Sequence, residues 1–321
     1  MPRRPAIARK IKEAWGARGS GLRSRFWRLN LLALAAALFP CAGALHSQGG
    51  IITTVVGPGL NGSGAAGDSL SLPTGVAVSG SGAGATIYTA DAYNCVVWQT
   101  QNGQTSVYAG IPGGCASGSI QPLPTETYLA YPVSLALCNG NLFLATHGID
   151  PSVSSGTPAS GLVFEIASNG AFSQVPLPGP ETGGDLFPVA LACDASGNIY
   201  LSAYADLLQD SGQFGQVNEL SPNGSGGWST TTLVADALDL AYPAIAVDPV
   251  NGDLYGYEAL QAGTGWLGTP LLTLGHIEDL SSSNNVPVAG NPTFDNVSGM
   301  TIDASGNIYI SQASSPYTYT S

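Results

Sequence analysis

The chain has 321 residues, enough for one large domain or two small ones, and only 9% of them are charged, against roughly 25% in typical soluble domains. All nine Lys and Arg residues lie within the first 28 positions, where Glu13 is the only acidic residue. Nucleic-acid binding by the remainder is excluded, because contacts to phosphate require cationic side chains. The 43 Gly and 22 Pro residues predict many turns and no long helix after residue 44.

The N-terminal segment, residues 1–44, has the layout of a cleaved signal peptide. A basic stretch is followed by the apolar run Leu31–Phe39 and by the small residues Ala42-Gly43-Ala44. The run is shorter than the roughly 20 residues that a spanning helix needs. We expect cleavage after Ala44, no membrane span in the mature chain, and a secreted or periplasmic protein. Lipid attachment at Cys41 is disfavoured, because Phe39 and Pro40 stand where lipidation motifs carry small residues.

Five segments of the remaining chain repeat one pattern, an apolar strand, a tight polar turn and a second apolar strand. The turns Asp194-Ala-Ser-Gly-Asn198 and Asp303-Ala-Ser-Gly-Asn307 have the same sequence, and we assign their Asp residues a structural role. A second hairpin with Asn-Gly between alternating runs follows in 95–108 and again in 163–175. The equivalent aromatic residues of the five units are Tyr88, Phe143, Tyr200, Tyr255 and Tyr309.

Four strands per unit at a near-constant period predict an all-β fold, a β-propeller of five four-stranded blades. The segment 50–57 is similar to the fourth strand of a unit, so we expect it to complete the last blade and close the ring. A six-bladed ring with one degenerate blade is the alternative.

The blocks Pro73-Thr74-Gly75-Val76-Ala77-Val78, Tyr88-Thr89-Ala90-Asp91 and Val107-Tyr108-Ala109-Gly110 resemble the NHL repeat. The resemblance covers residues 45–321 and implies an NHL-repeat β-propeller of the exported bacterial type. It departs from the family at Cys95, where many NHL units carry a basic residue, and its period is longer. The loops between strands are therefore expected to be extended.

Four cysteines remain after residue 44, and export to an oxidising compartment permits them to pair in three ways. Cys95 and Cys115 flank one hairpin, and we predict that they form a disulfide. Cys193 aligns with buried aliphatic residues of other repeats, which favours a small core hydrophobe. Cys138 falls in a further repeat.

The predicted connections between second and third strands, 147–161, 203–214 and 257–274, should lie together on one loop-rich face. They supply acidic and aromatic side chains suited to Ca²⁺ or to hydroxyl-bearing ligands. The ligand-binding candidates are Asp150, Tyr204, Asp206, Asp210, Tyr257, Glu258 and Trp266. A solvated acidic surface that keeps the protein soluble is the alternative interpretation.

Two functions follow from this face. The first is a non-enzymatic, monomeric extracytoplasmic binding scaffold for a protein or glycan, without a required cofactor, although Ca²⁺ would fit. The alternative is a propeller lyase or lactonase-like enzyme that uses rim carboxylates, His147 and a divalent metal. Acyl-transfer and nucleotide chemistry are disfavoured, because no Gly-x-Ser-x-Gly elbow and no phosphate loop occur.

Overall fold

The computed structural model describes residues 70–115, 120–148, 161–178, 185–206, 213–238, 240–264, 270–281, 286–288, 294–295 and 297–312. All of them belong to the unit Thr54–Ser321. They are almost entirely β-strand, and the two helical segments are the single 3₁₀ turns η1 (Gly82–Gly84) and η2 (Pro124–Glu126). Within these ranges no helix has the length and apolar character needed to cross a bilayer.

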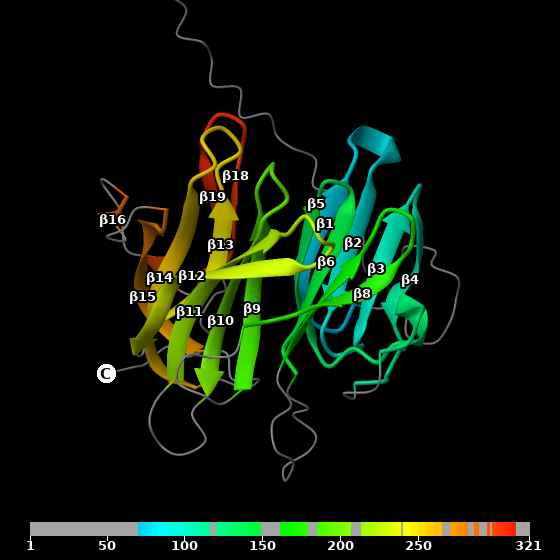
Figure 1. Ribbon diagram of the computed structural model, residues 1–321, viewed down its shortest axis with the longest axis horizontal. Coiled ribbons are helices and arrows are strands. Elements are labelled where there is room, and N and C mark those ends of the chain that lie inside the picture. Colours follow the sequence, from blue (N-terminus) through cyan, green and yellow to red (C-terminus); the bar gives the residue numbers. More distant parts are fainter. Residues whose placement is uncertain are drawn as a thin grey trace, which may run out of the picture. The chain divides into compact units, whose positions relative to one another are not determined.

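The strands form four antiparallel blades, in each of which neighbours in sequence are neighbours in the sheet (Figure 1). The first contains β1 (Pro73–Ser79), β2 (Thr86–Asp91), β3 (Val96–Gln101) and β4 (Gln104–Gly110). The second contains β5 (Pro132–Cys138), β6 (Asn141–Thr146), β7 (Leu162–Ile166) and β8 (Phe172–Val175). The third contains β9 (Asp185–Cys193), β10 (Ile199–Asp206), β11 (Gln213–Pro222) and β12 (Trp228–Leu238).

The fourth blade contains β13 (Leu240–Val247), β14 (Leu254–Thr264) and β15 (Pro270–Asp279), with two short pieces, β16 (Val286–Pro287) and β17 (Phe294–Asp295), both paired to β15. A final hairpin of β18 (Val297–Ile302) and β19 (Ile308–Gln312) forms a separate two-stranded sheet. The prediction of five four-stranded blades, or of six, is therefore corrected to four blades, because the fifth repeat contributes only this hairpin. The predicted closing strand, 50–57, and the predicted signal peptide, 1–44, lie outside the described residues.

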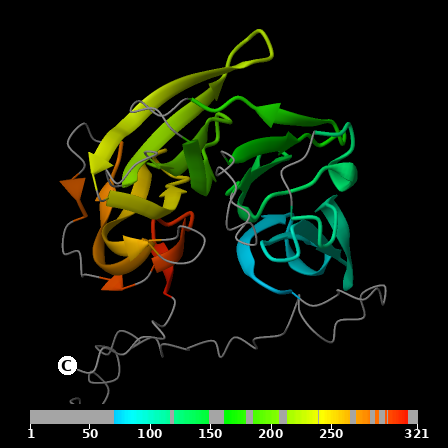
Figure 2. The same ribbon diagram turned by 90° about the horizontal axis from the view of Figure 1, so that it is seen from below.

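Successive sheets pack along their first strands, β1 on β5, β5 on β9, β9 on β13 and β13 on β18, which is the arrangement of propeller blades (Figure 2). The cores lie between the sheets. Leu135, Leu144 and Phe164 pack between the first and second blades, and Ile199 and Leu201 between the second and third. The fold is thus a β-propeller, as the repeat predicted.

The polar turns have the structural role expected of them. In the turn after β9, Asp194 Oδ1 accepts hydrogen bonds from the backbone N–H groups of Ser196 and Asn198, at 2.8 and 2.9 Å. Asp303 makes the same contacts in the turn after β18. There the hydrogen bond from the Asn307 side chain, helped by backbone N–H groups, lowers the pKa of Asp303 to about 2.

Two disulfides are present, and they indicate an oxidising, extracytoplasmic compartment. The predicted pair Cys95–Cys115 is confirmed, with its Cα atoms 5.1 Å apart. A second bond joins Cys138 at the end of β5 to Cys193 at the end of β9, across 6.1 Å between Cα atoms. The prediction of Cys193 as an unpaired core residue was therefore wrong, because the packing of β5 on β9 brings the ends of these strands together.

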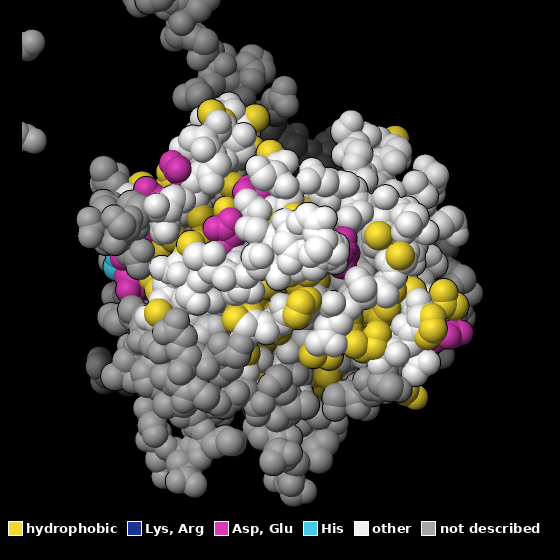
Figure 3. Space-filling view, in the orientation of Figure 1, with side chains coloured by type: hydrophobic (Ala, Val, Ile, Leu, Met, Phe, Trp, Pro, Cys, Tyr) yellow, Lys and Arg dark blue, Asp and Glu magenta, His cyan; other side chains and the backbone are white. Residues whose placement is uncertain are grey.

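The surface agrees with the unusual charge distribution. Figure 3 shows no Lys or Arg side chains on the face drawn, and a histidine beside acidic side chains at its left edge. Among the described residues, acidic groups therefore have only histidine as a cationic partner.

Candidate metal centre

The predicted ligand-binding residues whose side chains are described do not gather on an exposed face. Asp150, Asp210 and Trp266 lie outside the described residues, and Asp206 is the last residue of β10. Tyr204 and Tyr257 are buried, and Tyr257 Oη donates a hydrogen bond of 2.8 Å to the carbonyl of Phe294.

Two of the expected loops are largely strand. The β10–β11 ladder continues to the pair Asp206 and Gln213, and the β14–β15 ladder to Thr264 and Pro270. The predicted loops 203–214 and 257–274 are therefore corrected. Backbone N–H and C=O groups of these segments pair with each other across the sheet, which places Tyr204, Tyr257 and Glu258 on strands.

His147, the candidate base, is enclosed at the end of the second blade. Its Nε2 shares a hydrogen bond with Tyr204 Oη, and its ring stacks on Phe187 with centroids 5.4 Å apart. Burial lowers the pKa of His147 to about 4. Nδ1 is buried without a hydrogen-bond partner among the described residues. His147 is therefore neutral near pH 7, and its described contacts include no carboxylate.

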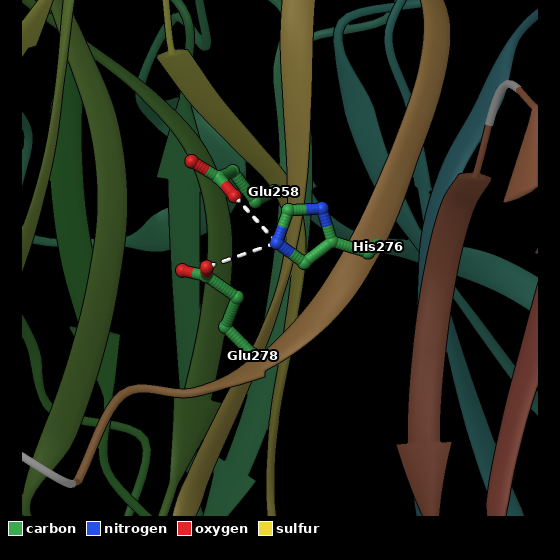
Figure 4. Close-up of side chains that lie close together, drawn as sticks. All are labelled: Glu258, His276 and Glu278. Atoms are coloured by element: carbon green, nitrogen blue, oxygen red, sulfur yellow. Dashed lines mark hydrogen bonds and ion pairs between the residues drawn. The ribbon is translucent and has the colours of Figure 1, made fainter. Parts of the chain in front are cut away.

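The fourth blade carries the one group of three metal-ligating side chains found in the described part of the chain, Glu258, His276 and Glu278. Glu258 Oε2 lies 2.8 Å and Glu278 Oε1 3.0 Å from His276 Nε2. Figure 4 shows both carboxylates directed at this nitrogen. One donor atom from each residue can be chosen so that all three lie within 4.8 Å of one another.

Sheet geometry produces this convergence. Glu258 on β14 stands directly opposite His276 on β15, so their side chains share a face of the sheet. Glu278 follows His276 by two residues and therefore projects from the same face. From β13, Tyr242 Oη donates to Glu278 Oε2 at 3.3 Å, which leaves Oε1 directed at the imidazole.

A glycine at position 275 leaves the space that this arrangement needs. A Cβ atom at Gly275 would lie 2.1 Å from the carbonyl oxygen of Glu258 and 2.6 Å from the Tyr257 ring. The two strands can therefore hold their present separation beside the cluster only with glycine at this position.

The electrostatics of the cluster favour an added positive charge. Partial burial, followed by the nearby Glu278 carboxylate, raises the pKa of Glu258 to about 7, and His276 opposes this rise. The exposed fractions of the side chains are 16% for Glu258, 8% for Glu278 and 34% for His276. Two carboxylates that repel each other beside a partly open imidazole form a set of donors that a divalent cation would neutralise.

The donor types indicate which cations fit. Zn²⁺ is bound by His nitrogen and Glu oxygen, and catalytic zinc sites have three protein ligands with a further position open. Imidazole also suits other transition metals, whereas Ca²⁺ prefers six to eight oxygen ligands. The cluster thus fits a transition metal better than the Ca²⁺ considered from the sequence.

Sequence reasoning singled out Glu258 but missed His276 and Glu278. The available signal was the alternation in His276-Ile-Glu278, which places an imidazole and a carboxylate on one face of any strand. The pairing of His276 with Glu258 could not be predicted from the sequence, because residues 257–274 were assigned to a loop and no strand pairing was expected there.

The described residues thus define a β-propeller with a carboxylate–histidine centre on one blade. No protein-family model matches the sequence, and no curated protein is similar to it. The NHL resemblance is therefore not confirmed by a family match.

Solved structures with a similar fold include three at low identity. A protein proposed to be a gluconolactonase is 14% identical with a TM-score of 0.46, over 71% of this chain and 67% of that one. The calcium-binding protein regucalcin from Agrobacterium tumefaciens is 14% identical with a TM-score of 0.40, over 75% and 67%. A luciferin-regenerating enzyme is 13% identical with a TM-score of 0.40, over 75% and 84%.

These findings correct the prediction of a non-enzymatic scaffold that binds through a loop-rich acidic face. The three neighbours are described as a proposed gluconolactonase, a calcium-binding protein and a luciferin-regenerating enzyme, and none as a binding scaffold. The structure gives a physical reason for this correction. Tyr204 and Tyr257 are buried, and Glu258 is engaged with His276 instead of facing a partner.

Proposed function

We propose that this chain is an extracytoplasmic, divalent-metal-dependent hydrolase of lactonase-like class, with Glu258, His276 and Glu278 as the metal ligands. The observation that carries the proposal is the convergence of both carboxylates on His276 Nε2. A cation would lie where the donor atoms of Glu258, His276 and Glu278 converge. The positive charge of the cation would oppose the burial and the Glu278 carboxylate, which together raise the pKa of Glu258.

Some residues of this chain would bind the metal, and others position those ligands. Glu258 and His276 come from paired positions on two strands, so the blade sets their separation before any ligand arrives. Tyr242 holds one oxygen of Glu278 and leaves the other for the metal. The partial exposure of His276 provides access for a substrate. A metal bound by three protein ligands supplies Lewis-acid activation of a carbonyl and of water.

The substrate class follows from the enzymatic alternative that the sequence raised. A lactone carries a neutral, polarisable carbonyl, so it needs no cationic partner for recognition, and the described residues include no Lys or Arg. Phosphorylated substrates fit this surface poorly.

The test uses protein stripped with EDTA and then titrated with Zn²⁺, Mn²⁺ or Ca²⁺ in a calorimeter. Lactone hydrolysis is followed by acid release with a pH indicator. We expect one metal per chain, loss of binding by about tenfold or more in Glu258→Gln, and no change in Glu126→Gln, whose carboxylate is exposed elsewhere. Binding without hydrolysis of any lactone would overturn the lactonase class, and absence of binding would overturn the whole proposal.

The NHL repeat family, the signal peptide 1–44 and a monomeric secreted or periplasmic product remain parts of this proposal. N-terminal sequencing of exported protein tests the leader, and a chain that begins at Leu45 is the expected product.

A further inference from the structure

A pocket between the second and third blades lies apart from the metal centre. It opens among three short turns, at Cys138–Asn141, at Ser196–Gly197 and at Asn223–Gly227, and its volume is about 260 Å³. Sites for drug-sized ligands measure roughly 300–1,000 Å³. The pocket therefore has room for a ligand of about one ring. Figures 1 and 2 show the end of the β11–β12 hairpin reaching alongside the second blade.

Aromatic side chains form one side of the pocket. Phe143 and Trp228 both line it and meet edge to face, with ring centroids 5.7 Å apart and planes at 90°. Phe143 is buried in the core between the blades, and Trp228 packs against that core while it stays partly exposed. The indole is thus held rigidly at the pocket, where its apolar face can receive a flat ligand.

Polar groups on the pocket wall are oriented before a ligand binds. Asn141 Nδ2 donates to Glu165 Oε1 at 2.7 Å, and Asn141 Oδ1 accepts from the backbone N–H of Ser168 at 3.0 Å. These bonds orient the Glu165 carboxylate at the pocket wall. On the opposite wall, Asn223 Oδ1 accepts from the Gly227 N–H at 2.8 Å, so the amide is also fixed.

The two blades are fastened to each other beside the pocket. Cys138 lines the pocket and is joined by a disulfide to Cys193 of the third blade. Gly197 has φ +88°, and a Cβ atom there would lie 2.9 Å from Nδ2 of Asn139. The pocket walls, which belong to different blades, are therefore preorganised, and preorganisation reduces the entropic cost of binding.

The charge and donor pattern determine the ligand class. With no Lys or Arg among the described residues, an anionic ligand has no counter-charge. One carboxylate accepts hydrogen bonds from hydroxyl groups, side-chain amides both donate and accept, and an indole face packs on C–H groups. We propose that this pocket binds a neutral sugar ring, either as a free monosaccharide or as a unit of a glycan, at a site separate from the metal centre.

The test is saturation-transfer NMR on the full chain with glucose, galactose, mannose, N-acetylglucosamine and cellobiose. We expect signal on the ring protons of at least one sugar, a roughly tenfold loss of affinity in Glu165→Gln from removal of a charge-assisted hydrogen bond, and loss of the signal in Trp228→Ala. Tyr128→Ala removes an exposed aromatic ring outside the pocket and should bind as the wild type does. A pull-down on insoluble cellulose or chitin separates glycan binding from monosaccharide binding.

A second variant keeps the test interpretable if Trp228→Ala does not fold. Ser196 is exposed at the pocket, so Ser196→Tyr fills the space without removing core atoms and should abolish binding. Absence of signal for every sugar with the wild-type chain would overturn the proposal, and so would undiminished binding in folded Ser196→Tyr. Metal removal with EDTA should not change sugar binding, so failure here and failure of the hydrolase proposal are distinguishable.

Discussion

The buried imidazole of His147 should make the protein lose stability on mild acidification. In the folded chain its pKa is about 4, because burial disfavours the charged ring, against an ordinary value of 6.5. The folded state therefore binds fewer protons than the unfolded state between these values. The contribution of His147 is fully present above pH 6.5 and is lost as the pH falls toward 4.

The magnitude follows from the two pKa values. Proton linkage gives a loss of about 2 kcal/mol in the free energy of unfolding between pH 7 and pH 5. In the metal-free protein Glu258 acts in the opposite direction, because its raised pKa makes the folded state bind more protons as the pH falls from about 7. The wild-type curve alone would therefore underestimate the effect of His147.

Comparison of the wild type with His147→Gln isolates the contribution of His147 to the pH dependence of stability. Urea unfolding of both proteins at pH 7 and pH 5, with disulfides intact, should show a difference in stability that shrinks by about 2 kcal/mol at the lower pH. Tyr204→Phe removes the hydrogen-bond partner but keeps the imidazole, so it should retain the wild-type pH dependence. Equal pH dependence in the wild type and His147→Gln would refute the assignment of a buried neutral ring.

Three further predictions concern the metal centre and the blades. Affinity for a transition metal, measured by calorimetry, should fall as the pH drops below 7, by up to about tenfold per pH unit, because the cation must displace the proton on Glu258; a flat profile would contradict this. Gly275→Ala should weaken metal binding and lower the melting temperature, since its Cβ would meet the Glu258 carbonyl at 2.1 Å. Ala substituted at Gly224, which has open space around it, is the control. Replacing Cys138 and Cys193 by Ser should cost about 4 kcal/mol by the chain-entropy relation for a 55-residue separation; unchanged urea unfolding would show that the bond is not formed in solution.

The propeller could be predicted from the sequence because its repeat consists of short turn and hairpin motifs that are recognisable locally. Asp194-Ala-Ser-Gly-Asn198 specifies a turn through its own side chains, and the Asn102-Gly103 pair specifies a hairpin, with φ +51° and +75°. Such signals need no knowledge of distant residues. The predictions of an all-β propeller and of the Cys95–Cys115 bond depended on them, and both are confirmed in the described residues, whereas the predicted number of blades was wrong.

Features that depend on register could not be predicted in this way. The extension of β14 through Leu260-Gln-Ala-Gly-Thr264 lacks the apolar alternation of a strand, and irregular pairing between Ala259 and Gln261 breaks the period further. Packing of one blade on the next brings Cys138 to Cys193, which sequence separation does not indicate. The metal centre was missed for the same reason, because its residues meet only through the pairing of β14 with β15.

Comparison of equivalent positions shows how one blade differs from the others. The residue three places after the repeated aromatic is Asp91, Thr146, Ala203 and Glu258 in the four blades, and its partners across the sheet are Val96, Leu162, Gln216 and His276. Only in the fourth blade do these two positions join a carboxylate to an imidazole.

The acidic residue of the first blade is used for a different purpose. Asp91 accepts hydrogen bonds from the backbone N–H of Leu72 and from Trp98 Nε1, so its carboxylate is satisfied by the fold. Glu258 instead faces His276, beside Glu278 (Figure 4). A purely structural carboxylate would be expected to be satisfied in the manner of Asp91. The unfavourable pairing of Glu258 with a second carboxylate therefore supports the proposal that the fourth blade holds the metal.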